Sequence, residues 1–486
     1  HRPAITFNKE ALTSAAGGGK RTSLVDRIFD RIVAEIQLGR LAPAKRIHSV
    51  RQLADECEVS RDTVARAYDK LVAHGYLESR AGSGFFVRAQ RRPVQVPIEI
   101  GALPTLPAWW RFQLVQPAGN LSSMPGLGLL PSDWLDETGL AKAMRSVARG
   151  SMRSLTGYGD PLGYLPLRQQ LQAKLRDLHI DAPVARIMVT AGATHALHLI
   201  VLAWLRTPGE HVLVEDPCSF LLRDRLLASG LEMLKVPREA DGPNLDVLRD
   251  YCMQYRPRFF FCNSVLHNPT SGHISPHKAF QILRLAEEFD LIIVEDDTYS
   301  DLMPPGATTP ATRLASLDQL QRVIYIGSFS KTIAPGLRVG YMCANAKILD
   351  WLQVYRTVSE IAAQSVGERV IYQLLSQGSY RHHCAQLRSR LDECRQPVIE
   401  SLGALGCTVD LDTSVGMYVW ATLPHDLDAM PVADELLKQG HLLAPGVLFS
   451  PERHAASKMR FNVSRTLASP ALPALERLIK ARASAG

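Results

Sequence analysis

Five short apolar runs recur between residues 186 and 327, and stretches with helical periodicity separate them. The runs are RIMVT (186–190), HVLVE (211–215), FFFCN (259–263), LIIVE (291–295) and RVIYIG (322–327). Strands that alternate with helices form a mostly parallel sheet, and ligands bind at the loops that follow such strands. The alternation therefore predicts an α/β domain from about residue 134, with its site among the residues that follow these runs.

The charge of the chain is concentrated at its N-terminus. Residues 1–92 hold 17 Lys and Arg against 10 Asp and Glu, whereas the remaining residues hold 38 of each. With 486 residues, the chain is long enough for two or more domains. A basic segment joined to a neutral body indicates a polyanion partner for that segment, most simply nucleic acid, with a solvated basic face as the alternative.

Composition argues against disulfides, metals and membranes. The eight cysteines fall in no metal-ligand spacing, so we expect them to be reduced and mostly buried, and we expect no metal. No signal peptide is visible, and the longest apolar run, LHLIVLAWL, is far too short to cross a membrane. We expect a cytoplasmic protein.

The basic segment has the pattern of a winged helix-turn-helix. Apolar residues at four-residue spacing predict a helix from Ser23 to about Gly39. SVRQLADEC (49–57) predicts a second helix, and Ser60 caps a third. YLESRAGSGFFV then alternates as a β-hairpin with a Gly-Ser-Gly tip, which predicts a wing. In such a unit the third helix lies in the major groove with its N-terminal residues nearest the bases.

Six residues of this unit are candidates for DNA contact. Arg61, Thr63 and Arg66 are the expected base readers, and Ser49 and Arg51 are expected to hold phosphate. Gly82 lets the wing approach the DNA backbone. Through SVRQLA, VSRDTVARAYDKLVAHGYL and RAGSGFFV, residues 23–88 resemble the DNA-binding domain of GntR-type bacterial regulators, with His48 where that family usually has proline. Each single arginine could otherwise belong to a solvated face.

Two further segments surround this unit. Residues 1–22, with GGGK at 17–20, are expected to be a flexible arm. Seven prolines between Arg88 and Asp133 predict a semi-rigid linker over residues 90–133, so that the DNA-binding domain covers 23–89 and the body 134–486.

Polar motifs follow the predicted strands and together describe one ligand. TAGATHAL opens a helix at which Ala193 and Thr194 can hold a phosphate. VEDPCSF supplies the aromatic Phe220, HNPT supplies Asn268, and VEDDTYS supplies an acid, Asp296, with Tyr299. SFSKTIAPGLR supplies the amine of Lys331. A phosphate cradle, a ring stacker, an acid for a ring nitrogen, donors for a phenolic oxygen and an amine for an aldehyde indicate pyridoxal 5′-phosphate (PLP).

On these motifs the chain from about residue 134 resembles the fold-type I aminotransferases. The resemblance implies an α/β domain with a smaller C-terminal α/β subdomain, with Lys331 as the Schiff-base lysine and Asp296 on the pyridine nitrogen. It also implies roles for the remaining matched residues: Asn268 and Tyr299 on the ring hydroxyl, Ser328, Arg338 and Thr194 on the phosphate, Tyr158 on a phosphate across a dimer, and Arg460 on a substrate α-carboxylate.

Two positions depart from the family pattern. Ser219 stands where the stacking aromatic normally lies, so that Phe220 either turns into the site or the stacking is weaker. Ser271 stands between NPT and the glycine that usually follows, which predicts a loop of different shape after Asn268.

A GntR-type reader joined to an aminotransferase-like body resembles the MocR subfamily of transcription regulators. The resemblance implies a homodimer with swapped, head-to-tail readers, a DNA operator with two half-sites, and an amine or amino acid effector that displaces Lys331 from an internal aldimine. One alternative is a working aminotransferase that carries a DNA-binding domain. In another, PLP itself is the signal.

Overall fold

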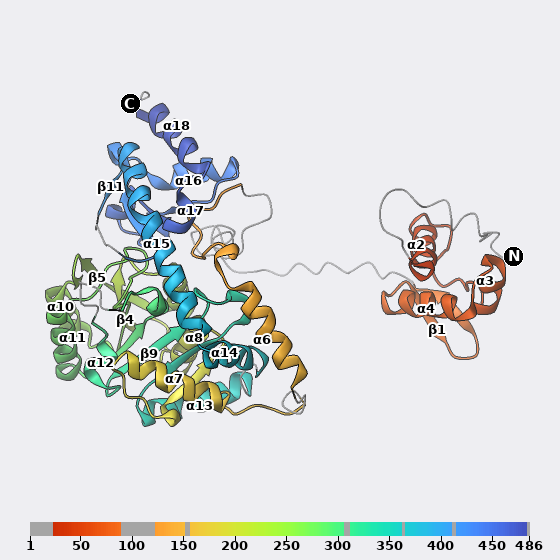
Figure 1. Cartoon of the computed structure of the whole chain (residues 1–486), viewed down its shortest axis with the longest axis horizontal. Coiled ribbons are helices and arrows are strands. Elements are labelled where there is room, and N and C mark those ends of the chain that lie inside the picture. Colours follow the sequence, from red (N-terminus) through yellow and green to blue (C-terminus); the bar gives the residue numbers. More distant parts are fainter. Residues whose placement is uncertain are drawn as a thin grey trace. The chain divides into compact units, whose positions relative to one another are not determined.

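The computed structural model describes residues 23–88, 122–150, 156–305, 312–361, 365–410 and 415–483. The chain divides into two compact units, His1–Ala102 and Leu103–Gly486, and each is described by itself (Figure 1). The predicted arm, residues 1–22, and the larger part of the predicted linker lie outside the described residues.

The described part of the N-terminal unit, residues 23–88, contains three helices and a β-hairpin. Its elements are α2 (Leu24–Gln37), α3 (Val50–Cys57), α4 (Arg61–Ala73), β1 (Leu77–Arg80) and β2 (Gly84–Val87). Ser23, Ser49 and Ser60 each cap a helix by accepting a hydrogen bond from a backbone N–H three residues later. The hairpin pairs Leu77 with Val87, and Gly82 takes a left-handed conformation in its turn. The predicted winged helix-turn-helix is confirmed.

The C-terminal unit is built on an eight-stranded sheet with the order β3-β10-β9-β8-β7-β4-β5-β6. The strands are β3 (Ile187–Thr190), β4 (His211–Asp216), β5 (Glu232–Glu239), β6 (Gly242–Pro243), β7 (Phe259–Cys262), β8 (Ile292–Asp296), β9 (Val323–Ser328) and β10 (Gly340–Cys343). The five predicted strands are confirmed, and β4, β5, β7, β8 and β9 are parallel. β10, which the sequence did not predict, lies antiparallel between β3 and β9.

Helices cover both faces of this sheet (Figure 1). One apolar core joins the sheet to α6 (Glu137–Arg149), α7 (Leu165–Asp177), α10 (Leu245–Tyr255), α11 (Pro276–Glu288), α12 (Leu314–Asp318) and α14 (Ser365–Ser376). The opposite core joins it to α8 (Ala193–Trp204), α9 (Phe220–Ala228) and α13 (Ala346–Glu360). Burial on both faces explains why the strands are continuous apolar runs.

A smaller subdomain contains a four-stranded sheet of order β11-β12-β14-β13. Its elements are α15 (Ser379–Ala404), β11 (Thr408–Val409), β12 (Tyr418–Thr422), α16 (Ala429–Lys438), β13 (Ala444–Pro445), β14 (Lys458–Asn462), α17 (Val463–Thr466) and α18 (Ala471–Ala483). The end of the predicted linker packs here, since Leu127 and Leu130 are buried in this core and Gly126 N donates to Leu442 O.

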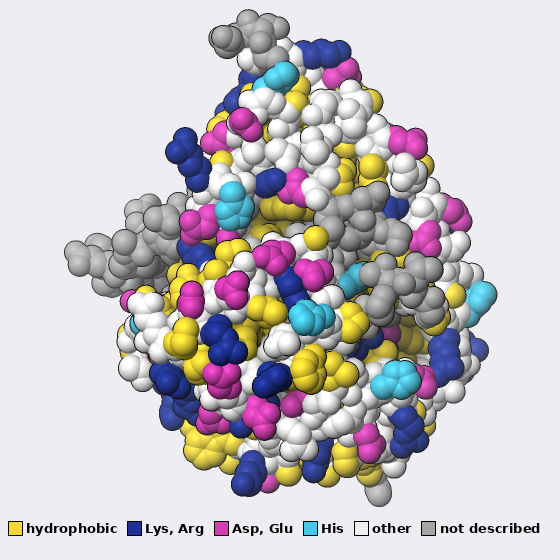
Figure 2. Space-filling view, turned by 90° about the vertical axis from the view of Figure 1, so that its left-hand side faces the viewer, with side chains coloured by type: hydrophobic (Ala, Val, Ile, Leu, Met, Phe, Trp, Pro, Cys, Tyr) yellow, Lys and Arg dark blue, Asp and Glu magenta, His cyan; other side chains and the backbone are white. Residues whose placement is uncertain are grey.

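Basic and acidic side chains are interspersed on the face of the molecule that Figure 2 displays. Within the described residues, no helix combines the length and the apolar character that a membrane span requires.

Candidate functional site

Three neighbouring strands bring the predicted phosphate-binding residues together at the side of the large sheet where β3 and β9 end. The strand register aligns Ser328 of β9 with Gly340 of β10, and Gly340 with Thr190 of β3. The turn after Thr190 leads into α8, whose first residues are Ala193 and Thr194. The first N–H groups of a helix have no partner within it and lie at its positive end. This side of the sheet therefore presents a hydroxyl and backbone amides close together.

Arg338 lies just before β10, and its side chain contacts the turn that follows Thr190. Its Nη2 donates to Ala191 O at 3.1 Å. A Cβ on Gly192 would lie 2.6 Å from that Nη2, and a Cβ on Gly340 would lie 2.8 Å from Gly192 Cα. Any larger residue at either glycine would separate the guanidinium, the turn and the strand. The structure thus brings Ser328, Arg338 and the start of α8 together, and their binding of phosphate stays a prediction.

Asp296 ends β8 on this side of the sheet. Its Oδ1 accepts from Thr298 N at 3.0 Å and from Thr298 Oγ1 at 2.5 Å. Burial raises the pKa of the Asp296 carboxyl, whereas the Thr298 hydrogen bonds and, more weakly, the charge of Lys331 lower it. A cation placed beside this carboxylate would stabilise its charged form.

Asn263 fixes Asp296 relative to Asn268. Asn263 Nδ2 donates to Asp296 O at 2.5 Å, and its Oδ1 accepts from Asn268 N at 2.8 Å. Nothing in the sequence marks Asn263, because an asparagine at a strand end is common and only its two hydrogen-bond partners reveal its position between Asp296 and Asn268.

Lys331 lies half-buried in the loop after β9, in the same region. Its Nζ donates to Gly128 O at 2.6 Å and lies 5.6 Å from the ring centre of Tyr299. Burial lowers the pKa of the Lys331 amine, with nearby Tyr418 acting in the opposite direction. A lowered pKa favours the neutral amine, which is the form that attacks an aldehyde.

Tyr418 is a member of this site that the sequence analysis missed. Its hydroxyl lies 3.0 Å from the hydroxyl of Tyr299, and the two rings meet edge to face. Ser271 holds the Tyr418 backbone, since its Oγ donates to Tyr418 O at 2.9 Å and accepts from Tyr418 N at 3.2 Å. The loop in which Ser271 departs from the family pattern therefore positions this tyrosine.

Arg460 on β14 completes the group and is 1% exposed. Its Nη1 donates to Asn268 Oδ1 at 2.8 Å, and its Nη2 donates to Gly126 O at 2.8 Å. Its guanidinium carbon lies 4.2 Å from the ring centre of Tyr418 and 4.7 Å from that of Phe449. Because Arg460 bonds Asn268, the structure joins the predicted carboxylate-binding arginine to a predicted cofactor residue.

Two predicted residues lie apart from these contacts. Phe220 begins α9 and is buried, with its ring edge to face against Phe449 at 5.9 Å. Tyr158 is 82% exposed. In this structure Phe220 is thus a core contact, and Tyr158 faces solvent.

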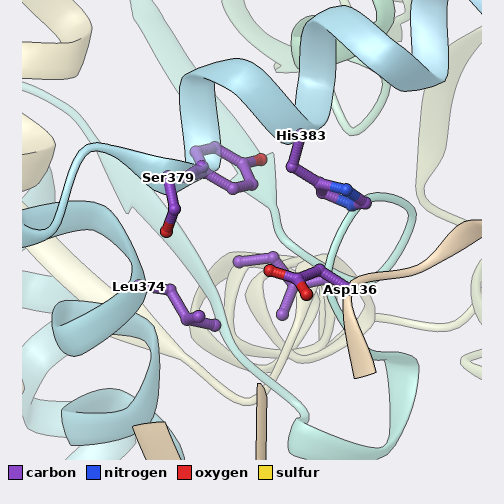
Figure 3. Close-up of a pocket in the computed structure, with 6 residues that line it drawn as sticks. Asp136, Leu374, Ser379 and His383 are labelled. Carbon is purple, nitrogen blue, oxygen red and sulfur yellow. The ribbon is translucent and has the colours of Figure 1, made fainter. Parts of the chain in front are cut away.

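A small pocket lies next to the residue that follows Lys331. Asp136, Leu374, Ser379 and His383 point toward it, with Tyr380 and Ile333 completing its lining (Figure 3). His383 Nε2 lies 2.7 Å from Thr332 O, and Tyr380 shares a hydrogen bond of 2.7 Å with Thr332 Oγ1. None of the six lining residues is a predicted ligand contact, and the contacts to Thr332 indicate that this wall supports the lysine loop.

The predicted DNA contacts lie on the surface of the N-terminal unit. Thr63 is half-buried, and the other five predicted residues are exposed: Ser49, Arg51, Arg61, Arg66 and Gly82. The Tyr68 hydroxyl donates to His48 O at 2.8 Å, which ties α4 to the turn before α3.

The wing has a basic neighbour that the sequence analysis missed. Arg46 pairs with Phe86 in an isolated β-bridge, and its side chain lies against Gly84. The bridge depends on a contact between residues forty positions apart, so no local pattern indicated it. Contact of these residues with DNA stays a prediction.

The fold and the site define an aminotransferase-like protein that carries a DNA-binding module. Residues 130–469 match the model of the family "Aminotransferase class I and II", and residues 24–87 match that of "Bacterial regulatory proteins, gntR family". The chain therefore belongs to the aminotransferase class I and II family, with a gntR-type domain before it. This is the domain pairing predicted through the resemblance to MocR regulators, and it is confirmed.

Two named transcription regulators match most of the length of this chain, and an aminotransferase structure matches about three quarters of it. The HTH-type transcriptional regulator YisV of Bacillus subtilis is 26% identical over 87% of this chain and 89% of its own length. NorG of Staphylococcus aureus, also named an HTH-type transcriptional regulator, is 25% identical over 83% of this chain and 92% of its own. A kynurenine aminotransferase of Pyrococcus horikoshii shares the fold with a TM-score of 0.69, at 23% identity, over 77% of this chain and 93% of that one.

Proposed function

We propose that this protein is a transcription regulator whose N-terminal unit binds an operator and whose C-terminal unit holds PLP on Lys331 and senses an amine or amino acid. The observation that carries the proposal is the meeting of the half-buried Lys331 and Asp296 with the buried Arg460 in one site, within a chain that also carries a gntR-type domain. Its relatives YisV and NorG are named as transcription regulators. Such a protein acts where the DNA is, in the cytoplasm.

The residues fit PLP by their chemistry. Ser328, Arg338 and the α8 N-terminus supply three kinds of phosphate donor, and the close approach of Gly192 to Gly340 keeps them together. Asp296 can hold a pyridinium proton. When bound, PLP supplies an aldehyde that forms a Schiff base with the Lys331 amine, with loss of water, and a ring that accepts electrons.

The chain's own residues would then distinguish effectors. Arg460 can bind a carboxylate through parallel N–H groups, so an amino acid gains a contact that a simple amine lacks. Effector binding that changes the C-terminal unit would alter operator affinity through a coupling free energy between the two sites.

A homodimer forms part of the proposal. α13 leaves an apolar row exposed, with Trp351, Val354 and Val358 at helical spacing and Ile361 just beyond the helix. Such a row on a soluble protein indicates an interface. The exposed Tyr158 is free to reach a partner's cofactor site. Two readers in one dimer would bind two half-sites.

Lys331→Ala tests the anchor. The variant is expected to bind operator at its basal level and to lack the yellow chromophore that PLP gives the wild type, as measured by gel shift and absorbance. A chromophore of unchanged intensity in the variant would show that another residue holds the cofactor.

Two rival functions are separated by further measurements. A working aminotransferase is favoured by the presence of Lys331, Asp296 and Arg460 together; sustained turnover of amino and keto acids with no change in operator binding would establish it. If PLP alone is the signal, gel shifts of apo and PLP-loaded protein differ without any amine, and equal binding in both states would exclude this function.

A further inference from the structure

A segment between the linker and the body contacts both residues that the proposed function assigns to ligands. We call residues 122–130 the strap. The carbonyl of Gly128 accepts from Lys331 Nζ at 2.6 Å, and that of Gly126 accepts from Arg460 Nη2 at 2.8 Å. A Cβ on Gly128 would lie 3.1 Å from the Tyr418 hydroxyl, 3.6 Å from Arg460 Nη2 and 3.8 Å from Lys331 Nζ. The strap therefore faces directly into the candidate site.

The ligand atoms and the strap compete for the same nitrogens. A Schiff base at Lys331 would leave Nζ with at most one hydrogen, whereas the free amine has two or three, so the hydrogen bond to Gly128 O would be lost or weakened. On Arg460, Nη1 is bonded to Asn268 and Nη2 to Gly126, so Nε is the nitrogen without a hydrogen bond. A carboxylate needs two adjacent N–H groups to bind in a bidentate manner. The fork of Nε and Nη2 brings an effector carboxylate onto the nitrogen that also bonds Gly126 O, so the carboxylate and the strap share Nη2.

The rest of the strap is held by the small subdomain. Asn462 Nδ2 donates to Leu127 O at 2.7 Å and to Leu129 O at 3.0 Å. Arg465 donates to Leu129 O at 2.7 Å and to Leu130 O at 2.8 Å. Gly126 N also donates to Leu442 O at 2.8 Å. Lys331 belongs to the large-sheet part of the unit, so its bond to Gly128 links that part to the strap.

We infer that the strap is the element that reports ligand occupancy to the DNA-binding domain: PLP on Lys331 and a carboxylate on Arg460 each weaken the hydrogen bond to one of its carbonyls. The inference rests on the proposed function. The place of the strap in the sequence supports the inference, because residues 89–121 join it directly to the winged helix-turn-helix domain. A change in the strap therefore acts on the chain that leads to the DNA reader.

Hydrogen exchange of the full-length protein tests the inference on peptides that cover residues 122–131. Four states are compared: the apo protein, the PLP-loaded protein, the loaded protein with a short amino acid, and the loaded protein with the amine that lacks its carboxylate. Loss of one charge-assisted hydrogen bond corresponds to about a tenfold rise in local opening, and exchange follows local opening. PLP is expected to raise exchange by about that factor, and the amino acid is expected to raise it further than the amine. Peptides from α11 serve as the internal reference.

The outcomes separate the two proposals. Protein that carries the chromophore but shows unchanged exchange in residues 122–131 overturns the strap inference and leaves the PLP regulator standing. Protein that never forms the chromophore with PLP overturns the proposed function, and the strap inference with it.

Arg465→Met provides an independent test, because it removes two strap donors without touching Lys331 or Arg460. In the absence of ligand, this variant is expected to show faster exchange in the strap and the operator affinity of ligand-saturated wild type. Lys480→Met, which removes an exposed cation on α18, is the matched control and is expected to behave as wild type. Faster exchange in Arg465→Met with the operator affinity and the effector response of wild type would refute the read-out role.

Discussion

Arg460→Met should abolish the preference of the protein for amino acids over the matching amines. In the wild type, a carboxylate on this buried arginine forms a charge pair of the kind whose removal costs about 3–5 kcal/mol. The carboxylate shares Arg460 Nη2 with Gly126 O, and complete loss of the hydrogen bond to Gly126 O would offset this gain by about 1.5–3 kcal/mol. The difference of about 2 kcal/mol corresponds to a preference of about 30-fold.

The assay is a titration of the chromophore with a short amino acid and with the amine that lacks its carboxylate, for wild type and variant. The ratio of the two apparent Kd values measures the carboxylate contact alone, because both ligands present the same amine. Arg168→Met is the matched control: it removes a buried arginine of α7 whose partners are Gly163 O, Val184 O and Asp160. A preference that survives in Arg460→Met would refute the assignment of this arginine, and a wild-type preference above about 1,000-fold would contradict the competition by Gly126.

Three further predictions concern other parts of the chain. Arg61→Ala should weaken binding to the specific operator by about 10- to 100-fold and to scrambled DNA much less, as measured by fluorescence anisotropy; an equal loss on both would indicate a phosphate contact. Burial lowers the pKa of His195 to about 4, and its Nδ1 accepts from Ala191 N, so between pH 6.5 and 4 the unfolded chain binds a proton that the folded chain does not. The free energy of unfolding should therefore decrease as the pH falls from 6.5 to 4. His195→Asn should show a smaller drop in Tm between pH 7 and pH 5 than the wild type. An unchanged drop would exclude His195 as a contributor. Val358→Glu should convert a dimer into monomers in sedimentation velocity and weaken operator binding through lost bivalency, whereas a stable dimer would remove α13 from the interface.

Local chemistry made the N-terminal unit predictable. Each of the three helices within residues 23–88 begins after a serine whose side chain caps it, and a glycine turn joins the two strands of the wing. These signals act over three or four residues, so they can be found without knowledge of the fold.

Long-range pairing explains what the sequence did not indicate. β10 has four residues, and its place between β3 and β9 depends on partners more than 100 positions away in the case of β3. Tyr418 enters the site because Ser271 fixes its backbone across 147 residues. Gly126 and Gly128 contribute carbonyl oxygens, which every residue type carries, so no residue identity could mark them. They lie within the stretch that prolines predict as a linker.

Competition between the strap and the ligands bears on the choice between enzyme and regulator. The strap carbonyls that bond Lys331 and Arg460 reduce the apparent affinity for cofactor and amino acid. The ligands bind best to the state in which these two side chains are free of the strap, and only a fraction of the protein is in that state. For catalysis this cost brings no gain, since it does not stabilise a transition state. A switch requires a ligand to bind the strap-released state more tightly than the strap-bound state, because a ligand can shift an equilibrium only by its differential affinity for the two states. The strap contacts therefore favour a sensor over an enzyme, and a loaded protein whose strap remained in place would remove this argument.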